Sequence, residues 1–146
     1  MSYRHVYVAR VAMGGNDTQT VQAFEEAEAF DGPSLIIAFS PCIAHGYDLA
    51  RGLDHQRLAV QSGYWPLFRY NPALLREGRN PLKLDSRPPT TPLKTYLASE
   101  GRFERTVRET DASHGGLLHA AEDDVAHRWS LYEQLAALPV SREPSS

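Results

Sequence analysis

Residues 6–39 decide the fold, and they read VYVARVAMGGNDTQTVQAFEEAEAFDGPSLIIAF. The run Val6–Val11 is rich in β-branched and aromatic residues, and the run Ser34–Phe39 is almost continuously apolar. Both compositions predict β-strands. The segment between them has the length and pattern of a helix, so the stretch predicts a βαβ unit with two adjacent parallel strands.

The glycine pair Gly14-Gly15 ends the first strand, and Asn16 or Asp17 can cap a helix. The helix of this unit is therefore expected from Thr18 to Ala29. Apolar residues at helical spacing predict the face that packs on the sheet. These residues are Val21, Phe24 and Ala27, with Ala23 and Phe30 beside them.

The rest of the chain alternates between helical and irregular patterns. We expect a helix over 54–62, an edge strand within 64–70 because Pro66 interrupts it, an irregular segment over 71–92, and helices within 93–107 and 117–138. The fold class is therefore α/β, with a partial parallel sheet and a mostly helical C-terminal extension. The tail 139–146 is expected to be disordered.

Two or three strands are few for a parallel sheet. Strands as apolar as Ser34–Phe39 are stable when both faces are covered and further strands flank them. We therefore expect the chain to be a piece of a larger α/β domain, or a subunit that must pair to fold well.

Composition excludes several classes of partner. The chain has 42% hydrophobic and 23% charged residues and a net charge of −3, without a basic stripe of the kind that neutralises nucleic-acid phosphates. No apolar run is long enough to span a membrane, and the first residues lack a leader pattern, which indicates a cytoplasmic protein.

Cys42 is the one cysteine, in the tripeptide Ser40-Pro41-Cys42 directly after the second predicted strand. Ligands of open α/β sheets gather at the carboxyl ends of strands. From the residues alone, Cys42 fits a buried inert thiol or a nucleophile paired with His45, and a reactive thiol needs an electropositive setting. One cysteine cannot build a metal cluster without partners from elsewhere.

An ordered series of short blocks resembles the C-terminal part of the pyruvate:ferredoxin (flavodoxin) oxidoreductase family over about residues 3–138. Arg102-Phe103 and the closing helix are similar to the end of that family. The blocks are Tyr7-Val8-Ala9, Met13-Gly14, Glu26-Ala27-Glu28, 32–38, Ser40-Pro41-Cys42-Ile43, His45-Gly46, 63–72, Asn80-Pro81 and Leu84-Asp85-Ser86.

The resemblance implies an enzyme that oxidatively decarboxylates pyruvate to acetyl-CoA with thiamine diphosphate and Mg²⁺, and passes electrons through [4Fe–4S] clusters to ferredoxin or flavodoxin. It implies that residues 1–72 are the C-terminal part of the thiamine-diphosphate-binding domain and that 73–138 form an irregular arm and helical extension. It also gives Cys42 the role of fourth thiolate of the cluster nearest the thiamine.

The remaining parts of such an enzyme would lie upstream of this chain. They include the other three cysteines and the segment that holds magnesium and the diphosphate, so no catalytic or thiamine-binding residue is assigned here. The isolated chain is expected to be inactive, and the complete enzyme is expected to be a homodimer. The alternatives are a non-catalytic fragment acting as an interaction module and an autonomous enzyme using Cys42 and His45.

Three further patterns have simpler interpretations. His119, Asp123 and His127 recur at a spacing that could bind a metal, but they lie opposite an apolar stripe and are expected on a solvated face. The Gly14-Gly15-Asn16 turn could bind a phosphate at the helix start, but it lacks the spacing of a nucleotide-binding loop and is interpreted as a turn with a cap. The aromatic block Tyr64, Trp65, Phe68 and Tyr70 is interpreted as packing.

Overall fold

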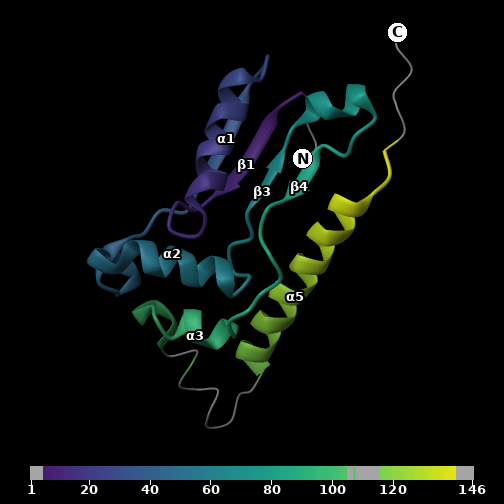
Figure 1. Cartoon of the computed structure of the whole chain (residues 1–146). Coiled ribbons are helices and arrows are strands. Elements are labelled where there is room, and N and C mark those ends of the chain that lie inside the picture. The colour runs from purple at the N-terminus through teal and green to yellow at the C-terminus, as the bar shows by residue number, and fades with distance from the viewer. Residues whose placement is uncertain (1–4, 105–106, 108–115, 141–146) are drawn as a thin grey trace.

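The computed structural model describes residues 5–104, 107 and 116–140, and its centre is a four-stranded sheet with the strand order β2-β1-β3-β4 (Figure 1). The strands are β1 (Tyr7–Val11), β2 (Ser34–Ala38), β3 (Phe68–Tyr70) and β4 (Leu82–Leu84). The fold is therefore α/β, as the sequence predicts.

The βαβ unit is confirmed. β1 and β2 pair in parallel from Tyr7 opposite Ser34 to Val11 opposite Ala38. Helix α1 (Asp17–Ala29) connects them and begins at Asn16, whose side chain accepts a hydrogen bond from the Gln19 amide at 2.9 Å. This contact satisfies one of the amides that a helix start leaves unpaired.

The predicted inner face of α1 is wrong in part. Val21 and Phe24 are each 56% exposed, whereas Gln19, Thr20 and Ala23 are buried. Polar residues turn inward because the sheet beneath α1 holds a buried arginine: Arg69 pairs with Asp85 at 2.9 Å and with Glu26 of α1. Gln19 joins this group by donating to Asp85 at 3.1 Å.

The second half of the sheet differs from the sequence expectation. β3 is an interior strand rather than an edge strand, because Pro66 lies before it and leaves the ladder intact. Its neighbour β4 falls inside the segment 71–92 that was expected to be irregular, and it pairs antiparallel to β3. The described residues thus form four strands rather than the expected two or three, and the sheet is mixed.

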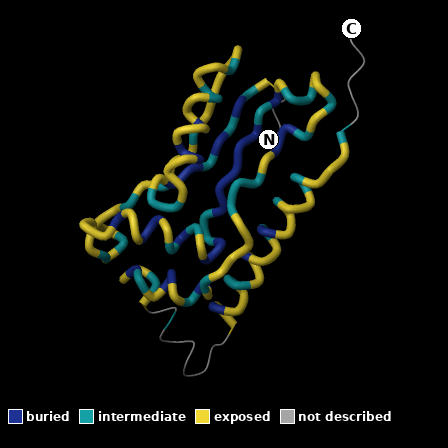
Figure 2. Tube along the Cα trace, in the orientation of Figure 1, coloured by how far each residue is buried: buried dark blue, intermediate teal, exposed yellow. Residues whose placement is uncertain are grey.

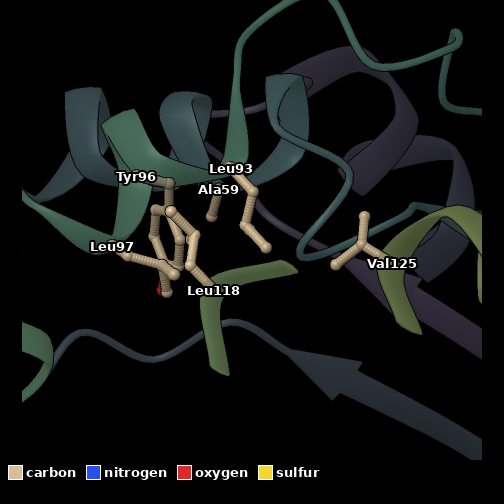
Figure 3. Close-up of a cluster of buried hydrophobic side chains, with 6 residues drawn as sticks. All are labelled: Ala59, Leu93, Tyr96, Leu97, Leu118 and Val125. Atoms are coloured by element: carbon tan, nitrogen blue, oxygen red, sulfur yellow. The ribbon is translucent and has the colours of Figure 1, made fainter. Parts of the chain in front are cut away.

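Helices close the end of the sheet where β1 and β2 finish. Figure 3 shows the apolar cluster that joins α2 (Gly52–Gln61), α3 (Leu93–Leu97) and α5 (Gly116–Ala137). Short 3₁₀ turns occupy the connections. They are η1 (Ile43–His45), η2 (Leu49–Arg51), η3 (Pro72–Glu77) and η4 (Gly101–Phe103).

Helix α5 covers the face of the sheet opposite α1, over β3 and β4. Its residue Tyr132 packs against Phe68, with ring centroids 5.2 Å apart. The buried residues Leu118 and Val125 confirm the apolar stripe expected for this helix. Figure 2 shows exposed residues along the outer sides of α1 and α5 and a mainly buried trace between them.

Strand β2 forms one edge of the sheet and is largely uncovered. Leu35 is 51% exposed and Ile37 40% exposed, while Ile36, on the α1 side, is half-buried. Val8, Ile36 and Phe39 are half-buried within the sheet and its helices. Among the described helices, none is long and apolar enough to cross a membrane. Of the tail 139–146 that was expected to be disordered, residues 141–146 lie outside the described residues.

Candidate functional site around Cys42

Cys42 lies where the sequence places it, beyond the carboxyl end of β2. Because β1 and β2 are parallel, the loop after β1 and the loop after β2 leave the sheet at the same edge. Gln56 of α2 connects the two loops: its amide oxygen accepts from Gly14 N at 2.7 Å, and its amide nitrogen donates to Phe39 O at 3.3 Å.

The contact between the first loop and α2 is close enough to require glycine at position 14. A Cβ atom built on Gly14 would lie 2.2 Å from the backbone oxygen of Leu53. Real Cβ atoms do not approach a backbone atom so closely, so any larger residue would push α2 away from the sheet edge. The glycine pair expected as a simple turn therefore also has a packing role.

The segment 42–47 that follows β2, here called the Cys42 loop, lies on the surface. Cys42 is an exposed free thiol, and its carbonyl accepts a hydrogen bond from His45 N at 3.0 Å. The 3₁₀ turn η1 inside the loop contains no buried residue. Apolar burial therefore contributes little to the position of this loop.

A buried carboxylate lies beside the loop. The Glu100 side chain has no exposed surface, and one of its oxygens is 2.7 Å from both His55 Nε2 and the Tyr96 hydroxyl. Its other oxygen accepts from Arg102 Nε. Burial alone raises the pKa of Glu100, but the hydrogen bonds from Tyr96, Arg102 and His55 outweigh it and hold that pKa below its usual value.

The Cys42 loop is attached to this carboxylate cluster at three points. His45 Nε2 is 3.3 Å from Arg102 Nη1, the Gly46 carbonyl accepts from Gly101 N at 3.3 Å, and the Tyr47 ring stacks on His55 with centroids 3.9 Å apart. Gly46 has a φ of 76°, a left-handed conformation that favours glycine. The loop therefore turns at Gly46 directly against the Gly101 backbone.

Two polar atoms of the loop are buried without a hydrogen-bond partner within the described residues: the Tyr47 hydroxyl and His45 Nδ1. His45 Nδ1 is 4.0 Å from Glu100, beyond hydrogen-bond distance. Burial and the charge of Glu100 raise the pKa of Tyr47. The hydroxyl therefore stays protonated at neutral pH and can donate a hydrogen bond.

Comparison with known proteins adds an independent observation. No protein-family model matches the chain. It is 49% identical over 144 residues to the pyruvate-flavodoxin oxidoreductase of Rhodospirillum rubrum and 47% identical over 137 residues to that of Nostoc sp.. The pyruvate:ferredoxin oxidoreductase of Moorella thermoacetica is 44% identical over 136 residues. The chain is related to one segment of these oxidoreductases.

The matches cover most of this chain and little of the relatives. They span 98%, 94% and 93% of the chain, but only 12%, 11% and 12% of the respective oxidoreductases. The chain thus spans about one eighth of the length of the oxidoreductases that it matches.

The described part of the chain contains no group of three or more His, Cys, Asp or Glu residues that could hold a metal ion. His119 and Asp123 are 74% and 70% exposed and form a surface pair at 3.7 Å, and His127 is exposed as well. The expected solvated face is confirmed. Cys42 can therefore supply one metal ligand, but within the described residues it has no companions for a complete site.

The pairing of Cys42 with His45 as a catalytic unit finds no support in the described geometry. The His45 ring lies against Arg102 and Glu100, and among the described residues no hydrogen bond connects it to the Cys42 thiol. The aromatic block is packing, as expected. Phe68 and Tyr70 are buried in the sheet, and the indole of Trp65 donates to Val11 O at 3.1 Å and stacks beneath Arg10.

Sequence reasoning missed Glu100 and His55. They are 45 residues apart, and neither belongs to a short motif that indicates a buried pair. Their partner Arg102 was noted only as part of the resemblance to the end of the oxidoreductase family. The detectable signal was weak: a glutamate directly before Gly101, the glycine that approaches the Cys42 loop.

Proposed function

We propose that this chain is one part of a pyruvate:ferredoxin (flavodoxin) oxidoreductase and that Cys42 is a thiolate ligand of its [4Fe–4S] cluster nearest the thiamine diphosphate. The observation that carries the proposal is the exposed thiol at the carboxyl end of a parallel strand, in a chain 44–49% identical to these enzymes. Such a position presents a thiolate to ligands from another segment while the strand fixes its backbone.

The surroundings of Cys42 fit one corner of an iron–sulfur cluster. When bound, the cluster accepts electrons and passes them on one at a time. Hydrogen bonds to cluster sulfurs and exclusion of water tune that property. The unpaired Tyr47 hydroxyl belongs to the same loop and is a donor of the required type. This chain's contribution is to orient one thiolate and to provide this donor.

The remainder of the enzyme would supply the other three thiolates and the residues that hold thiamine diphosphate and Mg²⁺. It would also cover the edge of the sheet at β2, where Leu35 and Ile37 are exposed. An uncovered apolar edge strand is rare in a protein that is complete by itself. The matched relatives are about eight times longer than the aligned segment, so enough polypeptide exists to add a further strand there.

The substrates and partners follow the relatives. We propose pyruvate and coenzyme A as substrates, ferredoxin or flavodoxin as electron acceptor, and a homodimeric complete enzyme. The runner-up proposal, a non-catalytic interaction module, would be favoured if no polypeptide carrying the missing ligands assembled with this chain. The isolated chain should not reduce a one-electron dye with pyruvate.

The proposal is tested by Cys42→Ser in the complete enzyme, formed by this segment with the remaining polypeptide. Serine is a poorer ligand for iron than a soft thiolate. We expect the signal of one cluster to be lost or altered in low-temperature EPR, with lower iron content and slower electron transfer to the acceptor. Pyruvate binding should persist.

The matched control is Ser40→Ala, an equally small change two residues away. It should leave iron content and the EPR spectrum unchanged. If the Cys42→Ser enzyme assembles every cluster and turns over normally, Cys42 is a packing residue and the proposal fails.

A further inference from the structure

We propose that Glu100 is a positioning residue that holds the Cys42 loop in place from beneath. The functional meaning of this inference depends on the proposed ligand role of Cys42, whereas the structural linkage can be tested without it. The inference concerns a buried charge to which none of the sequence patterns assigned a role.

Glu100 is buried in a way that is costly unless its charge is compensated. Its side chain is 0% exposed, yet three donors from three elements surround it: His55 from α2, Tyr96 from α3 and Arg102 from η4. Buried carboxylates persist in proteins when they are paired and fully hydrogen-bonded. The Glu100 carboxylate therefore fixes the relative positions of these three elements.

Two of the three donors also hold the Cys42 loop. Arg102, oriented by Glu100 through its Nε, reaches His45 Nε2 with its Nη1 at 3.3 Å. His55, oriented by Glu100 through Nε2, presents its ring to Tyr47 at a centroid distance of 3.9 Å and an interplanar angle of 22°. The carboxylate thus acts on the loop through one residue on each side of Gly46.

The loop has few other means of keeping its position. Cys42, Ile43 and Ala44 are exposed, and η1 has no buried residue. Its remaining tertiary backbone contact joins the Gly46 carbonyl to Gly101 N, directly after Glu100 in the chain. Loss of the carboxylate should therefore loosen residues 42–47 before it unfolds the sheet, because the sheet is stabilised by separate contacts.

The test uses amide hydrogen exchange of the 146-residue chain, because the amides of His45 and Gly46 donate within the loop, to Cys42 O and Ile43 O. Two variants are compared with the unmodified chain. Glu100→Gln removes the charge of the central carboxylate. Arg102→Gln removes the guanidinium that connects Glu100 to His45, and the change is tolerated because the Arg102 side chain is 35% exposed. Glu77→Gln is the matched control, because Glu77 forms an exposed pair with Arg79.

We expect exchange at His45 and Gly46 to accelerate about tenfold in both variants, the change expected when one charge-assisted hydrogen bond is lost. Exchange in β1 should stay unchanged, and Glu77→Gln should match the unmodified chain. The inference would be overturned if exchange at both amides stayed unchanged in both variants. It would also be overturned if these amides exchanged faster only when the amides of β1 did so as well.

A second measurement in the complete enzyme separates positioning from ligation. Arg102→Gln should keep the full iron content but change the EPR line shape or midpoint potential of the cluster that Cys42→Ser disrupts. A cluster unaffected by Cys42→Ser refutes the ligand role alone, since the exchange result stands by itself. If the Arg102→Gln enzyme has the same EPR spectrum and midpoint potential as the unmodified enzyme, the positioning role is refuted.

Discussion

Glu100 is a buried residue whose ionisation affects the stability of this fold. Its pKa is held below the usual value of a glutamate, so the folded chain favours the charged carboxylate more strongly than the unfolded chain does. The resulting stability is fully present above about pH 4.3, the ordinary glutamate pKa, and is lost as the pH falls through the lower pKa of the folded state. His55, Tyr96 and Arg102 face the carboxylate, and His45 lies 4.0 Å from it.

Glu100→Gln should therefore lower the free energy of unfolding by about 2 kcal/mol at pH 7, because a buried acceptor loses its charge while its donors remain. The difference from the unmodified chain should shrink as the pH falls through the lowered pKa of Glu100 in the folded state, where this carboxylate itself becomes neutral. Urea unfolding at pH 7, 5 and 3.5 measures this difference. A difference that does not depend on pH would show that side-chain shape, and not charge, stabilises the cluster.

At the scale of elements, the accuracy of sequence reasoning follows the range of the interactions. The unit β1-α1-β2 could be predicted because its apolar runs, glycine break and helix cap are local signals. The face of α1 could not be predicted, because its polar partners come from far along the chain: Arg69 of β3 pairs with Glu26, and Asp85 accepts from Gln19. β4 was missed for a similar reason, since three residues between proline-rich turns become a strand only beside β3.

The candidate site could likewise be predicted only in part. The position of Cys42 after a strand follows from a short apolar run. Its supporting cluster could not be predicted, because the partners of Glu100 come from three separate elements, α2, α3 and η4.

Asn80 connects two elements that the sequence does not relate. Its amide nitrogen lies 2.8, 3.0 and 3.0 Å from the carbonyl oxygens of Leu135, Ala136 and Leu138 at the end of α5, and its oxygen accepts from Leu82 N at 2.8 Å. The last carbonyls of a helix lack partners within the helix. Asn80 thus caps α5 and attaches it to the start of β4.

Asn80→Ala should lower the free energy of unfolding by about 1.5 kcal/mol, because the partly buried carbonyls of Leu135 and Ala136 lose their donor. Chemical denaturation gives the size of the effect, and amide exchange over 134–138 gives its location. Gln134→Ala is the control on the same helix, since Gln134 forms an exposed bond to Ser130 and should cost about 0.3 kcal/mol. Equal effects of the two substitutions would contradict the capping role.

At the scale of the whole molecule, strand β2 leaves apolar side chains exposed at one edge of the sheet. Leu35 and Ile37 point to the face that α5 leaves uncovered, whereas Ile36 packs under α1. An exposed apolar edge strand favours association with other chains. In the complete enzyme this edge should be covered by the remaining polypeptide.

Ile37→Lys should make the isolated chain more soluble and change its free energy of unfolding by less than about 0.5 kcal/mol, because the side chain is already exposed. Ile36→Lys, one residue earlier, should cost about 3 kcal/mol, because it places a charge between the sheet and α1. Solubility, sedimentation and urea unfolding report these outcomes. In the complete enzyme, Ile37→Lys should instead impair assembly of this chain with the remaining polypeptide. Normal assembly of the Ile37→Lys variant would show that the edge stays uncovered.

The central claim is that Cys42 binds iron in an enzyme of which this chain is one part. Its most direct test is a crystal structure of the complete enzyme with anomalous diffraction recorded at the iron edge. The account predicts an iron peak at bonding distance from Cys42 Sγ, in a cluster whose other three thiolates come from outside this segment. An iron cluster with four thiolates from elsewhere, and Cys42 remote from any iron, would contradict it.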